Sequence, residues 1–222
     1  MRLPDDFLKT GFAVQLTLDF ESAAAGRGLR LSQNVRDPLK VGQCAGVYMA
    51  TKARRSLASH NALVEADPAV GEYAMVLRIP GQGPMVIYAS PNRCNMGRVN
   101  EGPEPNIAFR DVDIPLDDHT TGVVLAGIIT REVQPGGFLC TDYGPSYERI
   151  REWRKYKDPC PNRGDAPKID ELGLAAEVTR AFGKDNLSAL VQKCGAYSVQ
   201  VTGISCREPT MITCHILCST PP

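Results

Sequence analysis

Apolar and polar residues alternate along much of the first half of the chain, as they do in half-buried β-strands. The clearest early example is residues 12–20, in which every second side chain is apolar. Short apolar runs at residues 29–31 and 45–49 predict two further strands, separated by a turn at Asp37-Pro38. Residues 51–67 mix apolar with basic and polar side chains, which predicts an irregular or partly helical segment.

The pattern then predicts a hairpin and one central strand. Residues 73–79 and 84–89 form the hairpin, which turns at Gly81-Gln82-Gly83. Residues 121–131 are almost continuously apolar, as expected for a strand covered on both faces. The acidic segment at residues 111–120 is predicted to be an exposed loop in front of that strand.

In the last third of the chain the apolar period becomes helical. Tyr147, Ile150 and Trp153 are spaced three apart, which places them on one face of a helix predicted over residues 147–156. Residues 158–167 contain several prolines and a glycine, so they are predicted to form a linker.

A small helical extension is expected after this linker. Residues 170–182 are rich in alanine and leucine and predict one helix. Asp185 or Asn186 is expected to cap a second helix that runs to Cys194. Residues 197–220 alternate in two apolar runs, which is typical of a hairpin.

Composition narrows the class of protein. A chain of 222 residues with 43% hydrophobic content suits one domain, or one domain with an extension. Its 20 glycines and 17 prolines favour many turns and short strands over a helical bundle. Lys plus Arg and Asp plus Glu both number 25, so the net charge is zero and direct nucleic-acid binding is not expected.

The sequence also bears on location. No apolar run approaches the roughly 18 residues that a membrane span needs, and residues 1–6 lack the apolar core of a secretory signal. We therefore expect an intracellular protein, in the nucleus or cytoplasm, without a membrane partner. In such a reducing compartment the 8 cysteines are expected to be free thiols.

Two segments carry the most specific chemical pattern. Residues 136–144, Gly-Gly-Phe-Leu-Cys-Thr-Asp-Tyr-Gly, follow a Pro135-Gly136 turn and place the hydroxyl of Tyr143 at a predicted strand end. Residues 95–106 read Asn-Met-Gly-Arg-Val-Asn-Glu-Gly-Pro-Glu-Pro-Asn. In order and spacing the two resemble the SET domain of protein-lysine methyltransferases. Its usual forms are Asn-His-Ser-Cys-x-Pro-Asn and, later, Pro-Gly-Glu-Glu-Leu-Thr-Tyr-Asp-Tyr-Gly.

Three earlier segments extend the resemblance. Residues 26–31, Gly-Arg-Gly-Leu-Arg-Leu, are similar to the Gly-x-Gly-Leu element that opens a SET domain. Residues 42–50 align with Gly-Glu-x-Ile-x-x-Tyr-x-Gly, with Ala50 in place of the last glycine. Residues 87–90 stand where the family has Ile-Asp-Ala. A dinucleotide-binding fingerprint at residues 26–28 is excluded, because the third glycine and the following helix are missing.

The resemblance implies a cofactor, S-adenosyl-L-methionine, and a role for individual residues. Tyr143 matches the catalytic tyrosine beside the transferring methyl group, and Tyr48 matches a tyrosine that lines the same pocket. The positions expected to contact the cofactor, several of them through the backbone, are Gly26, Arg27, Gly28, Leu29, Asn100, Glu101 and, by stacking on the adenine, Tyr147 or Trp153.

The chain also departs from the family pattern. Glu101 replaces the histidine of Asn-His, Gly102-Pro103 replaces Ser-Cys, and one residue fewer precedes Asn100. Thr141 replaces the aromatic residue that usually lines the lysine channel, which would widen the channel or leave it unused. These departures motivate an alternative hypothesis, a catalytically inactive SET-like module that binds a protein partner.

Simpler roles exist for several of these residues. Tyr143 would be an ordinary strand-end tyrosine, Asn100 and Asn106 would make loop hydrogen bonds, and Trp153 would anchor its own helix. His60 is expected to be solvated. The candidate zinc ligands are Cys206, Cys214, His215 and Cys218. Their spacing fits no common zinc site, so no metal is expected.

The prediction is a mostly β fold of short strands in small sheets, SET-like over residues 10–157, with a C-terminal helical extension over residues 158–222. The predicted activity is methyl transfer from S-adenosyl-L-methionine to a lysine side chain. The expected partner is a protein that bears the target lysine, such as a histone.

Overall fold

The structure is a computed structural model that describes residues 10–22, 26–48, 55–67, 74–78, 84–89, 95–102, 104–117, 120–143, 171–194 and 197–199. The strands of this part of the chain are β1 (Leu16–Ser22), β2 (Gly26–Leu31), β3 (Cys44–Val47), β4 (Arg55–Ser56), β5 (Ala74–Leu77), β6 (Met85–Tyr88), β7 (Asn100–Glu101), β8 (Ile107–Pro115), β9 (Thr120–Ile129), β10 (Cys140–Thr141) and β11 (Tyr197–Val199). Its helices are α2 (Leu57–Ala66), the 3-10 turn η2 (Met96–Arg98), α4 (Glu171–Phe182) and α5 (Lys184–Cys194).

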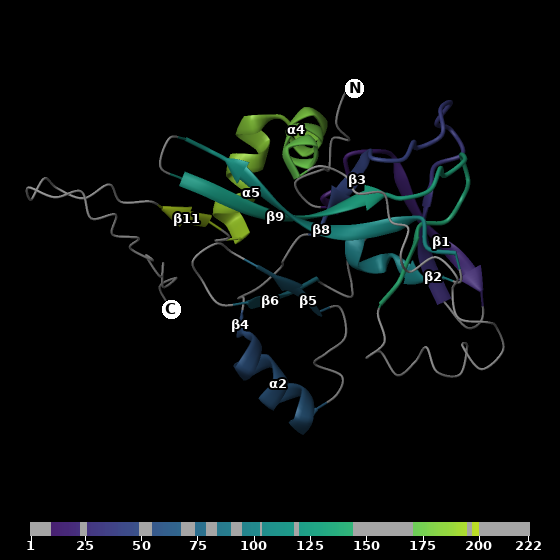
Figure 1. The fold of residues 1–222 in the computed structure, drawn as a ribbon. Helices are drawn as coiled ribbons and strands as arrows, with labels where there is room; N and C mark the ends of the chain where they lie inside the picture. The colour runs from purple at the N-terminus through teal and green to yellow at the C-terminus, as the bar shows by residue number, and fades with distance from the viewer. Residues whose placement is uncertain are drawn as a thin grey trace, which may run out of the picture.

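Strand β9 is the centre of the largest sheet (Figure 1). It pairs antiparallel with β8 over nearly its whole length, from Ile129 opposite Ile107 to Thr121 opposite Pro115. On its other side it pairs antiparallel with β3 and with β11. The predicted central strand at residues 121–131 is confirmed.

Both faces of β9 are buried, which explains its continuous apolar sequence. Side chains of alternate residues enter two different cores, because successive side chains of a strand point to opposite faces. One core, which includes side chains of β2, β5 and β6, receives Val123, Leu125 and Ile129. The other core, beneath α4 and α5, receives Val124, Ala126 and Ile128.

Strand β8 corrects the prediction of an exposed acidic loop at residues 111–120. Val112 and Ile114 are 3% and 1% exposed and pack in the core beneath α4. Asp111 lies on the opposite face, where its carboxylate accepts a hydrogen bond from Arg78 at 3.3 Å. The acidic residues suggested a loop, but they occupy the alternate positions of a strand whose other face is apolar.

The predicted strand at residues 12–20 is divided between two partners. Phe12 forms an isolated bridge with Gly46, and the amide of Ala13 donates to the carbonyl of Ala45 at 2.9 Å. The chain then leaves β3, and β1 pairs antiparallel with β2 instead. The alternating pattern persists throughout because both partners leave one face of the segment against the core.

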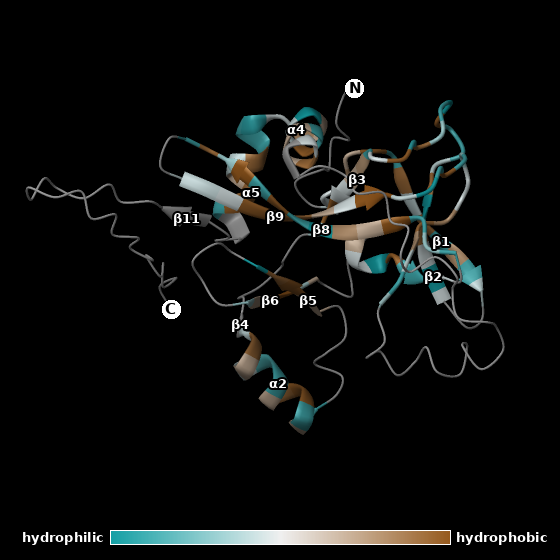
Figure 2. Cartoon of the chain, in the orientation of Figure 1, coloured by the Kyte–Doolittle hydropathy of each residue, from teal (hydrophilic) through white to brown (hydrophobic). Residues whose placement is uncertain are grey.

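A smaller sheet lies on the side of β9 opposite α4 and α5 (Figure 1). Strands β5 and β6 form its antiparallel hairpin, as predicted, and β4 pairs with the other edge of β6. Helix α2 follows β4 and confirms the partly helical prediction for residues 51–67. It has no buried residue, and Figure 2 shows apolar and polar bands interleaved along it.

The two predicted C-terminal helices are present and dock on the central sheet. Val178, Phe182, Leu187 and Val191 are at most 2% exposed, and full burial of each such side chain contributes about 1.5–3 kcal/mol. The predicted cap at Asp185 or Asn186 is wrong, because α5 begins at Lys184 and both residues lie within the helix. The Asn186 side-chain amide donates back to the carbonyl of Phe182 at 2.8 Å.

Glu177 ties α4 to β3. Its Oε1 accepts a hydrogen bond from the backbone amide of Cys44 at 2.9 Å, and its Oε2 pairs with Arg180 at 2.7 Å. The amide of Cys44 lies where the β3–β9 register shifts, so a side chain supplies the acceptor that the irregular ladder cannot.

The mostly β architecture of small sheets followed by helices is therefore confirmed. The predicted helix at residues 147–156, the linker at residues 158–167 and most of the predicted hairpin at residues 197–220 lie outside the described residues. No helix in the described ranges is both long and apolar enough to span a bilayer.

Candidate functional site

The Pro-Gly turn brings residues 137–139 alongside β2. Gly136 has φ +82°, and the amide of Gly137 donates to the carbonyl of Gln134 at 2.8 Å, which closes the turn. The amide of Leu31 then donates to the carbonyl of Gly137 at 2.9 Å. The amide of Leu139 donates to the carbonyl of Leu29 at 2.8 Å. The segment that leads to Tyr143 is thus fixed beside the Gly-x-Gly segment.

Strand β10 continues from this turn and pairs in parallel with β7. Cys140 lies opposite Asn100, and Thr141 lies opposite Glu101. The two motifs that the sequence separates by some forty residues therefore share one short ladder. Thr141 is only 5% exposed, so neighbouring residues cover its shorter side chain.

Asn106 connects these strands through its side chain. Its Nδ2 donates to the carbonyl of Phe138 at 2.9 Å, and its Oδ1 accepts from the amide of Cys140 at 2.9 Å. Its own backbone amide donates to the carbonyl of Cys140 at 2.8 Å. The final asparagine of the motif is therefore a structural clamp, which agrees with the simpler role considered for it.

Gly28 lies directly against Asn100. A Cβ at this position would lie 2.8 Å from Nδ2 of Asn100 and closer still to Oε2 of Glu21. A side chain here would have to displace both of these polar groups, which approach the backbone of β2 closely. Gly26 differs, because it is needed for its φ of +73° and not for space.

Glu21 is a member of this site that the sequence motifs do not reveal. Its Oε2 accepts a hydrogen bond from Nδ2 of Asn100 at 2.8 Å, and its Oε1 accepts one from Sγ of Cys140 at 3.7 Å. The β1–β2 register shifts between Phe20 and Ser22, so Glu21 is the extra residue of a bulge. No local signal predicts that bulge, and only the alternating pattern that ends at Phe20 marks its place.

The thiol of Cys140 is held protonated. Burial raises its pKa to about 12, and the nearby charge of Glu21 and its hydrogen bond act in the same direction. Cys140 is therefore a donor and not a nucleophile at neutral pH.

Tyr143 follows β10 and turns toward β7. Its hydroxyl donates to the carbonyl of Val99 at 2.7 Å, and the residue is 38% exposed. Since Val99 immediately precedes Asn100, this bond brings the tyrosine oxygen to the strand that also carries Asn100. The predicted catalytic residue and two predicted cofactor-binding positions, Gly28 and Asn100, therefore converge.

Tyr48 occupies a different environment. It is 5% exposed, and its ring packs edge-on against Phe109 with centroids 5.8 Å apart. A Cβ at Gly97 would lie 3.3 Å from its hydroxyl oxygen. Tyr48 thus supports the turn that precedes Asn100 from within the core, and its expected place in the pocket stays a prediction.

The remaining predicted contacts divide in three ways. Leu29 is fully buried, so only its backbone is available to a ligand. Nη2 of Arg27 donates to the carbonyl of Leu18 at 3.4 Å, and Glu101 stands in the β7–β10 ladder. Tyr147 and Trp153 lie outside the described residues.

His60 lies within the described residues, but the candidate zinc ligands do not. His60, expected to be solvated, has its Nδ1 2.7 Å from the hydroxyl of Tyr88. The described ranges contain no group of three or more His, Cys, Asp or Glu that could hold a metal ion. The C-terminal cysteines and His215 lie outside them.

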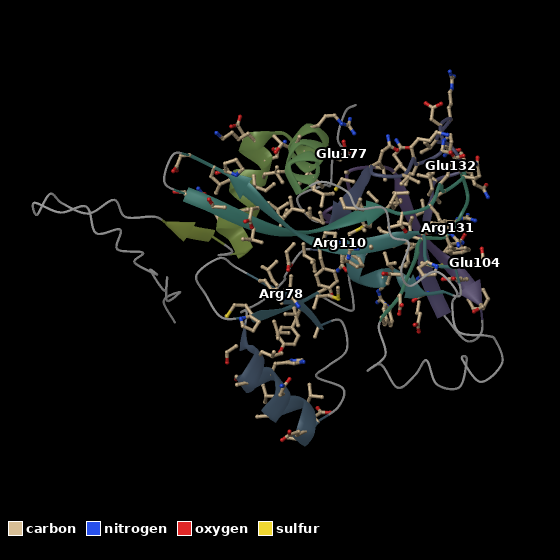
Figure 3. The ribbon with its side chains drawn as sticks, viewed as in Figure 1. Arg78, Glu104, Arg110, Arg131, Glu132 and Glu177 are labelled. Carbon is tan, nitrogen blue, oxygen red and sulfur yellow. The ribbon has the colours of Figure 1, made fainter. Side chains whose placement is uncertain are left out.

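An exposed ion pair lies outside this set of contacts. Glu104 and Arg131 form an ion pair of 3.1 Å on the same side of the molecule as the β1–β2 ladder (Figure 3). Both side chains are well exposed, so the pair contributes at most about 1 kcal/mol to stability.

Comparison with known proteins gives limited results. No protein-family model matches the chain. No curated protein matches it either. Among solved structures, the crystal structure of CpSET8 from Cryptosporidium is similar in fold, with a TM-score of 0.43 and 16% sequence identity. The match covers 60% of this chain and 58% of that chain.

Proposed function

We propose that this protein is an S-adenosylmethionine-dependent methyltransferase that modifies a lysine side chain of another protein. One observation carries the proposal. Gly28, Asn100 and Tyr143, whose order and spacing resemble the SET domain, meet at one junction of β2, β7 and β10.

The residues at this junction suit the cofactor's amino-acid end. Because Gly28 has no Cβ, the ends of the Glu21 and Asn100 side chains lie against the backbone of β2. A ligand that binds these two polar groups would therefore lie close to that backbone. The side chains of Asn100 and Glu21 supply an amide and a carboxylate beside it. When bound, S-adenosylmethionine would supply a methyl group on a positively charged sulfur, and no metal is needed for its transfer.

Tyr143 would act as an acceptor in this reaction. A phenol has one proton, and Tyr143 directs its proton to the carbonyl of Val99. Toward a reactant its oxygen therefore offers electron density only. Such an oxygen would stabilise positive charge on the transferring methyl group and would help to hold the methyl group and the amine in line.

The amine that attacks must be neutral. A neighbouring positive sulfur disfavours the ammonium form of the target lysine, so deprotonation does not require a strong base in the site. The carboxylate of Glu21 lies at the same junction. Its negative charge favours the approach of a cationic group.

Calorimetric titration with S-adenosylmethionine and with its demethylated product, S-adenosylhomocysteine, tests the proposal first. Saturable binding of both is expected. A second assay supplies the labelled cofactor with histones and with lysine-containing peptides, followed by hydrolysis and analysis for methyl-lysine. An absence of heat on titration would refute the proposal, whereas binding without transfer to any lysine would favour the inactive protein-binding module.

A further inference from the structure

The carboxylate of Glu21 occupies the centre of the candidate site. It comes from a β-bulge in β1, so its side chain leaves the regular alternation of that strand. Its Oε2 accepts from the amide of Asn100 at 2.8 Å, and its Oε1 accepts from the thiol of Cys140 at 3.7 Å. The same oxygen Oε2 would meet a Cβ at Gly28.

Both donors to this carboxylate are neutral. The Asn100 amide carries no charge, and the Cys140 thiol is protonated because burial raises its pKa to about 12. Within the described ranges no Lys, Arg or His side chain lies within ion-pair distance of Glu21, although other carboxylates there, such as Asp19 and Glu104, are paired. Among the residues that the structure describes, this half-buried negative charge thus has no positive partner.

We infer that Glu21 is the residue that recognises the α-ammonium group of the cofactor's amino-acid end. The inference rests on the proposed function, which brings that end to Gly28. Because Gly28 has no Cβ, the Glu21 carboxylate lies against the backbone of β2, and a ligand amine that reaches the carboxylate would also lie close to that backbone. A charge-assisted hydrogen bond from the ammonium would supply the missing positive partner.

In an alternative interpretation, Glu21 occupies the ligand's position through its hydrogen bond to Asn100. Removal of the carboxylate would then increase the affinity for the ligand. The Asn100 bond does not require the charge, because a glutamine at position 21 would offer its carbonyl oxygen to the same amide. Glu21→Gln therefore isolates the charge.

The experiment compares two ligands on two proteins. The first ligand is S-adenosylhomocysteine, which has the α-ammonium but not the positive sulfur. The second is its analogue with hydrogen in place of the α-amino group. Wild-type protein is expected to bind the analogue about 10- to 100-fold more weakly, the range for loss of a hydrogen bond to a charged group. In Glu21→Gln the difference should shrink to less than about threefold.

Glu104→Gln is the matched control. It removes one negative charge from an exposed carboxylate that is paired with Arg131, and it should retain the wild-type preference for the amino group. Circular dichroism and the melting temperature establish that each variant is folded.

The outcomes separate the two proposals. If wild-type protein binds neither ligand, the proposed function fails and this inference fails with it. If wild-type protein binds both equally, or if Glu21→Gln binds S-adenosylhomocysteine more tightly, the inference fails alone. The comparison on wild-type protein needs no variant, so it decides the matter even if Glu21→Gln does not fold.

Discussion

The hydroxyl of Tyr143 donates to the backbone carbonyl of Val99 across 2.7 Å. This bond joins the residue that follows β10 to the residue that precedes Asn100, and it fixes where the tyrosine proton points. A phenol anchored in this way presents the same acceptor to every reactant, without the reorganisation that a free rotor would need.

Tyr143→Phe removes that oxygen and keeps the ring. We expect kcat for methyl transfer to fall by at least about 100-fold, the usual effect of removing one preorganised polar group. Cofactor affinity by calorimetry should change by less than threefold, because the ring and the strands remain. Tyr88→Phe is the control, since its hydroxyl bonds His60 in the smaller sheet. Equal loss in both variants would contradict the assigned role.

Gly28→Ala is expected to weaken ligand binding without a large loss of stability. The new Cβ would meet the ends of two flexible side chains, Glu21 and Asn100, which can move at a cost of about 1 kcal/mol or less. Folding should therefore survive, whereas S-adenosylhomocysteine binding should weaken by at least tenfold. Calorimetry and thermal unfolding measure the two effects.

Gly122→Ala should show the reverse pattern. Its Cβ would lie 2.7 Å from a methyl carbon of Val191 on α5, so overpacking should cost about 1–3 kcal/mol. Affinity for the ligand should stay unchanged. If Gly28→Ala protein binds S-adenosylhomocysteine as tightly as wild type does, the ligand does not approach β2 at Gly28.

Asn106→Ala tests the clamp. It deletes two hydrogen bonds, to Phe138 and Cys140, and leaves two partly buried backbone groups without partners, which should lower the free energy of unfolding by about 2–3 kcal/mol. Methyl transfer should fall as well, because β10 positions Tyr143. Asn34→Ala, at an exposed turn, should change stability by less than about 0.5 kcal/mol. Urea titration of both variants makes the comparison.

The pKa of Cys140 gives a prediction about alkylation. With a pKa of about 12, the thiol is almost fully protonated at pH 8, so iodoacetamide should label it on the order of 100- to 1,000-fold more slowly than in urea. Burial is the largest cause and Glu21 adds to it.

Removal of the carboxylate lowers that pKa. In Glu21→Gln, Cys140 should therefore be labelled at least about threefold faster at the same pH, as followed by peptide mass spectrometry. Cys44 is the internal control, because burial raises its pKa to about 12 as well but its charged neighbours are Glu177 and Arg180. If the alkylation rate of Cys140 is unchanged in Glu21→Gln, Glu21 does not interact with the Cys140 thiol.

Glu177→Ala tests how α4 is held. Loss of the acceptor for the Cys44 amide should destabilise the protein by about 1.5–3 kcal/mol. Glu65→Ala, on the helix α2 that has no buried residue, should be near neutral. Chemical denaturation followed by circular dichroism distinguishes the two.

Sequence patterns predicted the elements whose signal is local. The apolar run of β9, the β5–β6 hairpin and the helices α4 and α5 all follow from periods of two or 3.6 residues. Strand β8 was missed because Asp111 and Asp113 suggested a loop, although Val112 and Ile114 between and beside them are buried. Charge on one face of a strand conceals burial on the other.

The candidate site was predictable only in part. Tyr143, Gly28 and Asn100 were found because their residue types recur in a fixed order, and Asn106 belongs to the same motif. Glu21 was not found, since a glutamate at a strand end has no distinctive neighbours in sequence.

By itself the sequence determined the succession of short strands and helices, the Pro-Gly turn before Tyr143 and the lack of a side chain at Gly28 of β2. These depend on the spacing of apolar residues and on backbone freedom, which are local properties. Only the tertiary structure decided that the carboxylate of Glu21 meets Asn100 and Cys140, residues 79 and 119 positions away. A bulge turned that side chain toward them, and its direction depends on the register between strands and not on any residue alone.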